Sequence, residues 1–505
     1  MKTIAALLSG LAERHGGRIA VTDAGRSADF ATLDRRACTL ARALVRSGAI
    51  PGSIVAALVN NGVPMIELFM AAAKARVTLL PLNWRLAAGE LDYILGDAAP
   101  GLLFVSDGLA GLAGRLAAPP RSILVADGGG ECAYEDFLRT GDVDAALPEA
   151  RPTDAWLMLY TSGTTGRPKG CLLDQGGQHA AALAMRDIWG ATPEDCLGSC
   201  LPLFHVGGMG IFMGHFGGGA AVHIAPRSLA ATDCLAWLAE LRCTTAAIPV
   251  QFYDTMLEQQ RRAPRSLALR RVNLGGGMHP PGFVRAVLDV LRVDAVCGYG
   301  QTEAGGFVSM ETHEEQLARP ASCGRVMPHL ESCIVDDADE PLPAGETGEL
   351  CLRGPSVMQG YRGQEAATAQ ALRHGWLHTG DMCRFDADGF LYLVGRKKEL
   401  IKSGGENVYP REVEEALAAH PAVVDCSVFG VPHEYWGEAV KAAVVLRDGA
   451  SASPRELAEW CRDRIAGYKR PRYVEIIAAI PRSEIGKVQK LELAARPVTP
   501  DQATD

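Results

Sequence analysis

An eleven-residue run of hydroxyls, glycines and cations follows a short apolar stretch. The run Tyr160–Gly170 reads YTSGTTGRPKG and comes directly after the apolar residues 155–159. Glycine allows backbone N–H groups to approach an anion closely, the hydroxyls add donors, and Arg167 and Lys169 add positive charge. This composition predicts a cradle for the phosphates of a nucleotide. The alternative is a flexible surface turn, for which Ser, Thr and Gly are equally typical.

The run differs from the Walker loop of common phosphotransfer enzymes. Counted from Gly163, the pattern GxxxxGK[ST] needs a glycine where the chain has Pro168. Ordinary P-loop phosphotransfer is therefore disfavoured.

Six further motifs follow in chain order. They are LPLFHVGG from 201, LGGG from 274, GYGQTE from 298, HTGD from 378, GRKKELIKSGGENVYPREVE from 395 and PRSEIGKVQK from 481. With the first run, this set resembles the adenylate-forming superfamily of acyl-CoA synthetases, amino-acid adenylation domains and luciferases. The resemblance covers nearly the whole chain. It implies that a carboxylate attacks the α-phosphorus of ATP, a step that needs fixed cations and donors around the developing charge.

The resemblance implies a binding site for ATP and Mg²⁺. Glu303 is expected to ligate Mg²⁺, a hard cation that prefers oxygen donors, and Thr302 to contact phosphate. Asp381 and Arg396 are expected to bind the ribose hydroxyls, and Tyr299 to flank the adenine. The other nucleotide-binding positions that it implies are Thr161, Ser162, Gly163, Thr164, Thr165, Lys169, Gly275, Gly276, Gly277 and Gln301.

The same resemblance implies that a small C-terminal domain turns between two half-reactions. Lys487 matches the family's mobile lysine, which bridges the attacking carboxylate and the α-phosphate, and Lys398 matches the hinge. After adenylation, the turn is expected to withdraw Lys487 and to bring a pantetheine channel to the acyl-adenylate. The channel residues are Ser403, Gly404, Gly405 and Glu406.

His205 distinguishes this chain within the superfamily. It matches the aromatic or histidine position beside the acyl-adenylate in CoA ligases, whereas amino-acid adenylation domains usually carry an aspartate there to pair the substrate ammonium. An α-amino acid is therefore an improbable substrate. The alternative interpretation is that His205, a lone histidine near glycines, has only a structural role. The expected catalytic residues are Lys487, His205, Glu303 and Thr302.

A basic segment late in the chain points to coenzyme A as the acceptor. GYKRPR at 467–472 resembles the patch where aryl-CoA ligases bind the CoA nucleotide. Arg470 and Arg472 suit phosphates, and Tyr468 or Trp436 suits an adenine face. The alternative is a solvated basic turn.

Several departures from the family pattern concern the acid. The chain reads GGGMHP at 275–280, has Gln301 where Met is commoner, and has Gly298 where malonate-activating relatives tend to place an arginine. A second carboxylate would lack a counter-ion, so we expect a monocarboxylic acid, aromatic or of medium chain length. The expected acyl-pocket walls are Phe204, Val206, Phe252, Tyr253, Met278 and Phe307.

Composition sets further bounds. The chain has 505 residues, a net charge of −9, and 14 cysteines without a CxxC pair, which we interpret as reduced thiols of a cytoplasmic protein. The acidic excess disfavours nucleic acid as a partner. No stretch approaches the roughly 18 apolar residues of a transmembrane helix, and a signal peptide is improbable.

The elements that must position these motifs follow from hydrophobic patterning. Helical segments at 32–47 and 64–75 alternate with apolar runs at 54–59, 78–82, 102–105, 123–126, 220–224, 245–248 and 293–296. This alternation is typical of α/β folds with parallel sheets. We therefore expect a large N-terminal domain of parallel-rich sheets flanked by helices, with a short β-rich subdomain at its end. It should span residues 1–395.

Residues 396–505 are expected to form a small, mobile α+β domain. It should contain helices at 412–419 and 454–465 and strands at 423–429 and 442–446.

The sequence thus predicts an AMP-forming carboxylic acid–CoA ligase that uses ATP, Mg²⁺ and coenzyme A. Two alternatives stay open: an acyl-AMP ligase that loads a carrier protein, and a catalytically silent homologue that only binds a nucleotide or acyl-CoA. A homodimer is expected only because symmetric oligomers are common among soluble enzymes.

Overall fold

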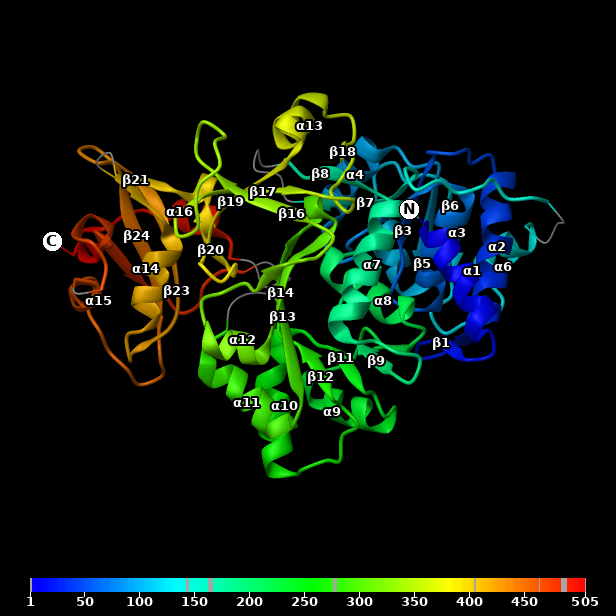
Figure 1. The fold of residues 1–505 in the computed structure, drawn as a ribbon, viewed down its shortest axis with the longest axis horizontal. Coiled ribbons are helices and arrows are strands. Elements are labelled where there is room, and N and C mark those ends of the chain that lie inside the picture. Colours follow the sequence, from blue (N-terminus) through cyan, green and yellow to red (C-terminus); the bar gives the residue numbers. More distant parts are fainter. Residues whose placement is uncertain are drawn as a thin grey trace. The chain divides into compact units, whose positions relative to one another are not determined.

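The computed structural model describes residues 2–141, 145–161, 167–275, 279–403, 406–462, 464–482 and 488–504 (Figure 1). The chain divides into two compact units. Unit 1 comprises Met1–Ser332 and Cys351–His378, and unit 2 comprises Cys333–Leu350 and Thr379–Asp505. The predicted α/β class is confirmed, with parallel-rich sheets in the large N-terminal part and a smaller C-terminal part. The boundary expected at residue 395 separates the N-terminal domain from the C-terminal domain that is expected to turn. Its position stays a prediction.

The first sheet of unit 1 positions three of the seven predicted motifs, those that begin at residues 201, 274 and 298. Its strands are β1 (Ile19–Thr22), β2 (Ser27–Asp29), β9 (Cys196–Ser199), β10 (Ala221–Ile224), β11 (Thr245–Ala247), β12 (Arg271–Asn273), β13 (Asp294–Gln301), β14 (Gly306–Thr312) and β15 (Arg325–Val326). Their order is β15-β14-β13-β12-β11-β9-β10-β1-β2. The pairs from β13 to β1 are parallel, whereas β14, β15 and β2 add antiparallel edges. Strand β13 runs further than the expected 293–296, which places Tyr299 and Gln301 on a strand.

The second sheet of unit 1 carries the glycine-rich run at one of its hairpins. Its strands are β3 (Ile54–Leu58), β4 (Thr78–Pro81), β5 (Leu102–Ser106), β6 (Ser122–Val125), β7 (Ala155–Thr161), β8 (Lys169–Asp174) and β18 (Gly360–Tyr361), in the order β18-β8-β7-β4-β3-β5-β6. Every residue of β3, β4 and β5 is buried, as expected for parallel strands covered on both faces. The continuous apolar runs of the sequence therefore became central strands.

Helices pack against these sheets in unit 1. The α-helices are α1 (Ile4–His15), α2 (Phe30–Arg46), α3 (Val63–Ala75), α4 (Ala88–Ala98), α5 (Ala110–Ala113), α6 (Ala133–Arg139), α7 (Gln175–Trp189), α8 (Val206–Gly217), α9 (Ala231–Glu240), α10 (Tyr253–Arg262), α11 (Pro281–Leu291), α12 (His313–Ala318) and α13 (Glu365–Ala371). Short 3₁₀ turns are η1 (Asp107–Leu109), η2 (Val250–Phe252), η3 (Thr302–Ala304) and η4 (Arg373–Gly375). Asp29 caps α2 and Asp174 caps α7, each accepting a backbone N–H at 2.7 Å.

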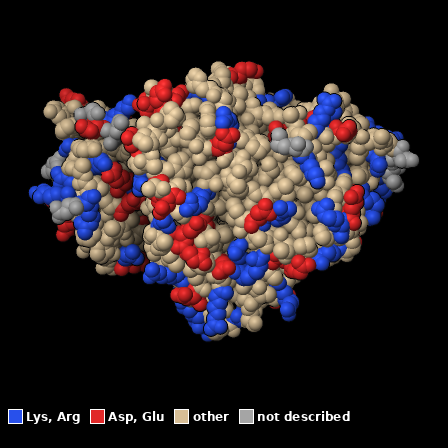
Figure 2. Space-filling model, in the orientation of Figure 1, with Lys and Arg blue, Asp and Glu red and all other residues tan. Residues whose placement is uncertain are grey.

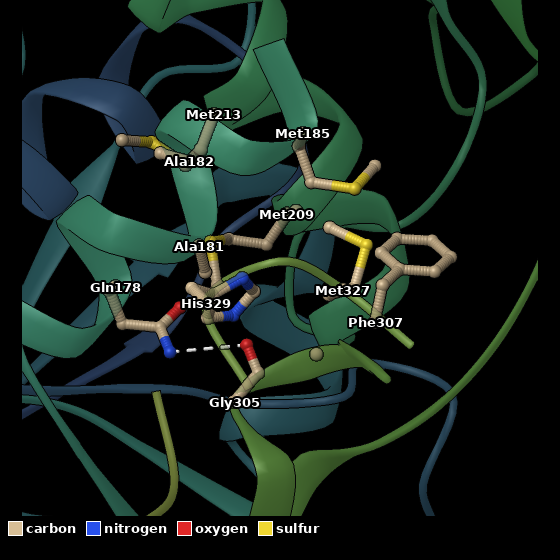
Figure 3. A pocket seen from close by; sticks show the side chains of 12 residues that line it. Gln178, Ala181, Ala182, Met185, Met209, Met213, Gly305, Phe307, Met327 and His329 are labelled. Atoms are coloured by element: carbon tan, nitrogen blue, oxygen red, sulfur yellow. Dashed lines mark hydrogen bonds between the residues drawn. The ribbon is translucent and has the colours of Figure 1, made fainter. Parts of the chain in front are cut away.

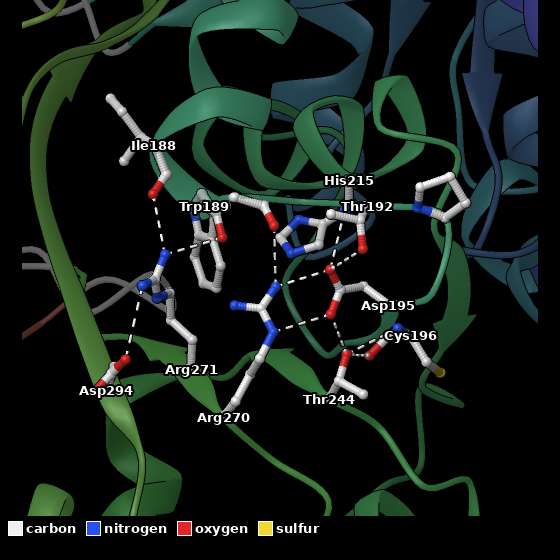
Figure 4. A network of polar contacts seen from close by, with 12 residues as sticks. Ile188, Trp189, Thr192, Asp195, Cys196, His215, Thr244, Arg270, Arg271 and Asp294 are labelled. Atoms are coloured by element: carbon white, nitrogen blue, oxygen red, sulfur yellow. Dashed lines mark hydrogen bonds and ion pairs between the residues drawn. The ribbon is translucent and has the colours of Figure 1, made fainter.

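A polar network fixes the C-terminal end of α7 to the first sheet (Figure 4). The guanidinium of Arg271 donates to the carbonyls of Ile188 and Trp189 at 3.1 and 2.9 Å, which are end groups that the helix itself leaves unsatisfied. Arg270 makes a bidentate pair with the buried carboxylate of Asp195, at 3.0 and 2.8 Å. The hydroxyl of Thr244 donates to the same carboxylate at 2.7 Å.

This network predicts a pH-dependent stability. Burial raises the pKa of Asp195, but hydrogen bonds from Arg270, Thr244 and Thr192 outweigh it and lower the pKa to about 2. Because the unfolded value is roughly 3.9, the stabilisation is fully present above that pH and is lost as pH falls through about 2. Asp195→Asn should lower the free energy of unfolding at pH 7 by about 2–4 kcal/mol and flatten its decrease in acid. Urea unfolding at pH 7 and at about pH 2 measures this, with Asp187→Asn at an exposed pair as the control. A wild-type-like midpoint would contradict it.

A four-stranded sheet contains residues of both units. It consists of β16 (Glu331–Val335), β17 (Gly348–Arg353), β19 (Leu377–Phe385) and β20 (Leu391–Arg396), in that order. This is the short β-rich portion that the sequence predicted. Asp381 and Arg396 face each other on its antiparallel pair β19 and β20.

The remainder of unit 2 is a small α+β fold with its own core. Its strands are β21 (Ile401–Ser403), β22 (Glu406–Val408), β23 (Val423–His433), β24 (Gly437–Leu446) and β25 (Tyr473–Ile476). Its helices are α14 (Pro410–Ala418), α15 (Pro454–Trp460) and α16 (Lys490–Ala494), with 3₁₀ turns η5 (Lys397–Glu399), η6 (Gly467–Lys469) and η7 (Pro500–Gln502). The helix expected over 454–465 is wrong beyond Trp460, because Cys461 N–H bonds to the carbonyl of Ala458 in a tighter turn. Leu417, Val428 and Val440 lie in the buried core.

The surface carries both signs of charge. In Figure 2, Lys and Arg side chains alternate with Asp and Glu side chains over the visible face. Among the described residues, no helix is both long and apolar enough to cross a lipid bilayer.

Candidate active site

The two ends of the glycine-rich run meet on one hairpin. Strands β7 and β8 are antiparallel, and their register pairs Thr161 with Lys169. The intervening residues Ser162, Gly163, Thr164 and Thr165 lie outside the described part of the chain. The structure therefore places a hydroxyl and a cation at the base of the predicted phosphate cradle.

Glu303 lies beside this base. Its Oε1 accepts hydrogen bonds from Thr161 Oγ1 at 3.3 Å and from Tyr361 Oη at 2.9 Å. Its Oε2 accepts none from the described residues. A carboxylate with one oxygen held and the other available suits Mg²⁺, which usually takes one or two carboxylates together with substrate phosphates. The described residues contain no group of three His, Cys, Asp or Glu that could hold a metal by itself.

Tyr361 is a site residue that the sequence did not reveal. Burial, followed by the charge of Glu303, raises the pKa of its phenol, so the hydroxyl stays protonated and donates to Glu303. The ammonium of Lys169 lies 5.0 Å from the centre of its ring. Tyr361 reaches this place because β18 pairs with β8 across nearly 190 residues of chain, with Tyr361 opposite Cys171. The only local signal was an unremarkable Gly-Tyr pair.

The turn η3 that presents Thr302 and Glu303 is anchored from two sides. Cys171 on β8 contacts the carbonyl of Thr302 at 3.7 Å through its sulfur. The N–H of Met358 donates to the carbonyl of Glu303 at 2.8 Å. These contacts fix the orientation of the predicted Mg²⁺ ligand.

The other unit 1 positions lie on the neighbouring strands. Tyr299 and Gln301 are on β13, and Gly275 follows β12. The Oε1 of Gln301 is buried without a hydrogen-bond partner among the described residues. Gly276, Gly277 and Met278 fall outside them.

A narrow pocket, partly open to solvent, lies between α7, α8 and β14 (Figure 3). Of the predicted wall residues, Phe307 lines it, whereas Phe204, Val206 and Phe252 do not. Tyr253, also predicted, is fully buried in a separate core cluster. The lining residues are Gln178, Ala181, Ala182, Met185, Met209, Gly210, Met213, Gly305, Gly306, Phe307, Met327 and His329. Gly305, which is two residues after Glu303 in the chain, is one of these lining residues.

Two further observations concern residues that the sequence predictions name. His205 is exposed at the N-terminus of α8, and its Nδ1 accepts the N–H of Gly207 at 3.1 Å, which leaves Nε2 as the protonated nitrogen of a neutral ring. A Cβ at Gly298 would lie 2.7 Å from the ring of Phe307. The glycine thus makes room for Phe307 and Met310, whose side chains would have to shift to admit a larger residue at this position.

The ribose-binding residues predicted in unit 2 form an ion pair. Arg396 Nε lies 2.8 Å from Asp381 Oδ1, and the Asp381 side chain is 1% exposed. Lys398, the predicted hinge, is exposed in η5 two residues after Arg396.

The predicted CoA patch is only partly available for phosphate. Lys469 contacts Glu412 at 2.6 Å, and Arg470 lies 3.4 Å from Glu459. Arg472 stacks over the ring of Trp436, with 4.2 Å to its centre. The structure therefore brings Arg472 and Trp436 together, and it places carboxylates beside Lys469 and Arg470.

The remaining predicted residues of unit 2 are distributed as follows. Tyr468 is 39% exposed, with the Lys469 ammonium 5.6 Å from its ring centre. Ser403 is buried and pairs with Glu406 and Gly437. Lys487, Gly404 and Gly405 lie outside the described residues.

Comparisons with known proteins agree with this arrangement. The family model described as "AMP-binding enzyme" matches residues 9–362, and "AMP-binding enzyme C-terminal domain" matches residues 412–487. The chain is 35% identical over 502 residues to an indoleacetate–CoA ligase of Aromatoleum aromaticum, with 96% of each chain covered. It is 33% identical to the fatty acid–[acyl-carrier-protein] ligase ScoC of Streptomyces coeruleorubidus, over 94% of this chain and 93% of that one.

A solved structure is similar over the whole chain. The o-succinylbenzoate CoA synthetase of Bacillus subtilis, in complex with its acyl-adenylate intermediate, has a TM-score of 0.84 and 26% identity, with 99% of each chain covered. The two family models, the relatives and this fold agree with the order of the seven motifs. The chain therefore belongs to the family of AMP-binding enzymes, within the adenylate-forming superfamily that contains the acyl-CoA synthetases.

Proposed function

We propose that this protein is an AMP-forming acid–CoA ligase that acts on an aromatic or medium-chain monocarboxylic acid. The observation that carries the proposal is the position of Glu303. Its carboxylate stands at the base of the phosphate cradle, held by Thr161 and Tyr361, and the pocket begins two residues later at Gly305. An acid whose side chain fills this pocket would present its carboxylate near the phosphate-binding end of unit 1.

The residues divide the chemistry into two steps. In the first, a carboxylate oxygen attacks the α-phosphorus of ATP and pyrophosphate leaves. Thr161 and Lys169 would bind phosphate oxygens, Glu303 would hold Mg²⁺, which neutralises phosphate charge when bound, and Lys487 would stabilise the attacking carboxylate. In the second, the thiolate of CoA attacks the acyl carbonyl and AMP leaves. Asp381 and Arg396 would bind the ribose throughout.

An acid panel tests the activity directly. Formation of AMP and pyrophosphate should require ATP, Mg²⁺ and a monocarboxylic acid, and acyl-CoA should accumulate when CoA is present. Failure of every acid to release pyrophosphate would instead favour the catalytically silent homologue. Failure of CoA alone, with transfer to a phosphopantetheinyl carrier, would favour the carrier-loading alternative, which the similarity to ScoC keeps open.

The acceptor can also be tested through the Arg472–Trp436 pair. Arg472→Ala should raise the KM for CoA about tenfold, because a phosphate contact of about 1.4 kcal/mol is lost. Acid-dependent pyrophosphate release without CoA should be unchanged. Arg464→Ala is the matched control, since Arg464 stacks on Trp460 in the same unit, with 3.5 Å to the ring centre. An unchanged KM for CoA would remove Arg472 from the acceptor site.

Two further properties belong to the proposal. The protein is expected in the cytoplasm, and it is expected to form a symmetric homodimer. Light scattering of the purified protein measures the second, and a monomer mass would contradict it.

A further inference from the structure

The acyl pocket combines pliable apolar walls with one polar end. Four of its lining residues are methionines, at positions 185, 209, 213 and 327, and Phe307 adds an aromatic face. Methionine is flexible and makes favourable contacts with aromatic rings. Small residues of α7 and α8 face the same space, namely Ala181, Ala182 and Gly210. These walls suit a flat, ring-bearing acid.

The polar end is formed by Gln178 and His329. Gln178 Nε2 donates to the carbonyl of Gly305 at 3.1 Å, which fixes its carboxamide (Figure 3). In the same view, the imidazole of His329 lies between Gln178 and Met327, beside Gly305. Among the described residues that line the pocket, His329 is the titratable one.

The hydrogen bonds behind His329 determine which of its nitrogens carries the proton. Ser356 Oγ donates to the carbonyl of Ala304 at 2.8 Å, and a carbonyl can only accept. The single hydroxyl proton of Ser356 is therefore used. His329 Nε2 lies 3.0 Å from the same oxygen, so Nε2 must donate to it. In the neutral ring, Nδ1 is then a bare lone pair.

This lone pair has no protein partner. His329 Nδ1 is buried and has no hydrogen-bond partner among the described residues. Burial lowers the pKa of the imidazole to about 4, so the ring is neutral at pH 7 and cannot use Nδ1 as a donor. Buried polar atoms are rarely left unpaired in folded proteins, because the lost hydration is costly. His329 is one of the residues that line the pocket, so a ligand that enters there can bring a donor to Nδ1 once the ring is uncovered.

We propose, building on the proposed function, that the acid activated here carries a hydrogen-bond donor at the end remote from its carboxylate, and that His329 Nδ1 accepts it. The donor is a hydroxyl or a ring N–H. Acids of the same shape without that donor leave Nδ1 buried and unpaired, and they are discriminated against.

Matched acids test this inference. Pyrophosphate release is measured with 4-hydroxycinnamate against 4-fluorocinnamate, and with indole-3-acetate against benzothiophene-3-acetate. Within each pair, only the donor is removed at nearly constant size. In at least one pair, the donor acid should have a kcat/KM at least about tenfold higher, and that pair identifies hydroxyl or N–H as the source. Equal efficiencies within both pairs would overturn the inference while leaving the ligase activity intact.

Variants assign the effect to His329. His329→Phe keeps a ring but removes the acceptor, so the ratio within the preferred pair should fall to about one while the acid without a donor is still activated. Met327→Leu, in the same pocket, should keep the wild-type ratio. Ser356→Ala retains the imidazole but frees its Nε2, and it should reduce the ratio severalfold even where His329→Phe folds poorly. A wild-type ratio in both polar variants would overturn the role of His329. Absence of pyrophosphate with every acid would instead contradict the proposed function itself.

Discussion

Replacing Lys487 by alanine is expected to reduce acid-dependent pyrophosphate release by roughly a hundredfold to a thousandfold. That is the effect of removing one group aimed at charge that develops in a transition state. Lys487 matches the mobile lysine of the family, which meets the attacking carboxylate and the α-phosphate only during adenylation. With this role, Lys487 is not expected to take part in the second half-reaction. Thioesterification of supplied acyl-AMP by CoA should therefore remain close to the wild-type rate.

Measuring the two half-reactions separately makes this prediction specific. Single-turnover assays of pyrophosphate release and of acyl-CoA formation from acyl-AMP should diverge only for the Lys487 variant. Arg482→Ala is a suitable control, since Arg482 precedes Lys487 by five residues and pairs with Asp425 at an exposed position, at 2.8 Å. Undiminished adenylation in Lys487→Ala would sink the assignment of this lysine. An equal loss in both half-reactions would point to damage of the fold.

Glu303→Gln is expected to have the second-largest effect. The carboxamide can still accept hydrogen bonds from Thr161 and Tyr361, so the local geometry should survive. It lacks the negative charge that binds Mg²⁺, however. Adenylation at saturating ATP should fall about a hundredfold, and the Mg²⁺ concentration for half-maximal activity should rise at least about tenfold.

A Mg²⁺ titration of pyrophosphate release separates charge from positioning. Tyr361→Phe removes the 2.9 Å hydrogen bond to Glu303 but keeps the ring beneath the Lys169 ammonium. It should cost less than about tenfold in rate, since a single hydrogen bond contributes about 0.5–1.5 kcal/mol. An unchanged Mg²⁺ requirement in Glu303→Gln would remove Glu303 from the metal site. Equal losses in both variants would contradict the prediction that the charge of Glu303 contributes more than its hydrogen bond from Tyr361.

Patterns within short segments predicted the elements of this fold well. The apolar runs at 54–59, 78–82 and 102–105 became adjacent, fully buried parallel strands, because such runs can be stable only when covered on both faces. The helix expected at 32–47 appears as α2 with Asp29 as its cap. The extent of β13 was missed, since glycine and polar residues in GYGQTE weaken any strand signal.

Site residues separated in sequence from any motif could not be predicted. Tyr361 reaches Glu303 only through the pairing of β18 with β8, and His329 reaches the pocket from the segment that follows β15. The sequence around Tyr361 and His329 shows no motif. Each side chain is surrounded by residues that are more than a hundred positions away or that belong to other elements. The predicted pocket walls were chosen as apolar neighbours of motifs. Phe307 is one of the residues that line this cavity, and the contacts of the other predicted walls with the acid stay a prediction.

The sequence by itself determined the α/β class, the family and the residues whose types suit phosphate, Mg²⁺ and ribose. Those depend on local composition and on the order of seven motifs, which a linear chain contains explicitly. The tertiary structure decided which oxygen of Glu303 is held and which nitrogen of His329 is bare. It also decided which cations of GYKRPR are already paired. These properties arise from distances between remote residues and from burial, and neither is written in the spacing of the residues along the chain.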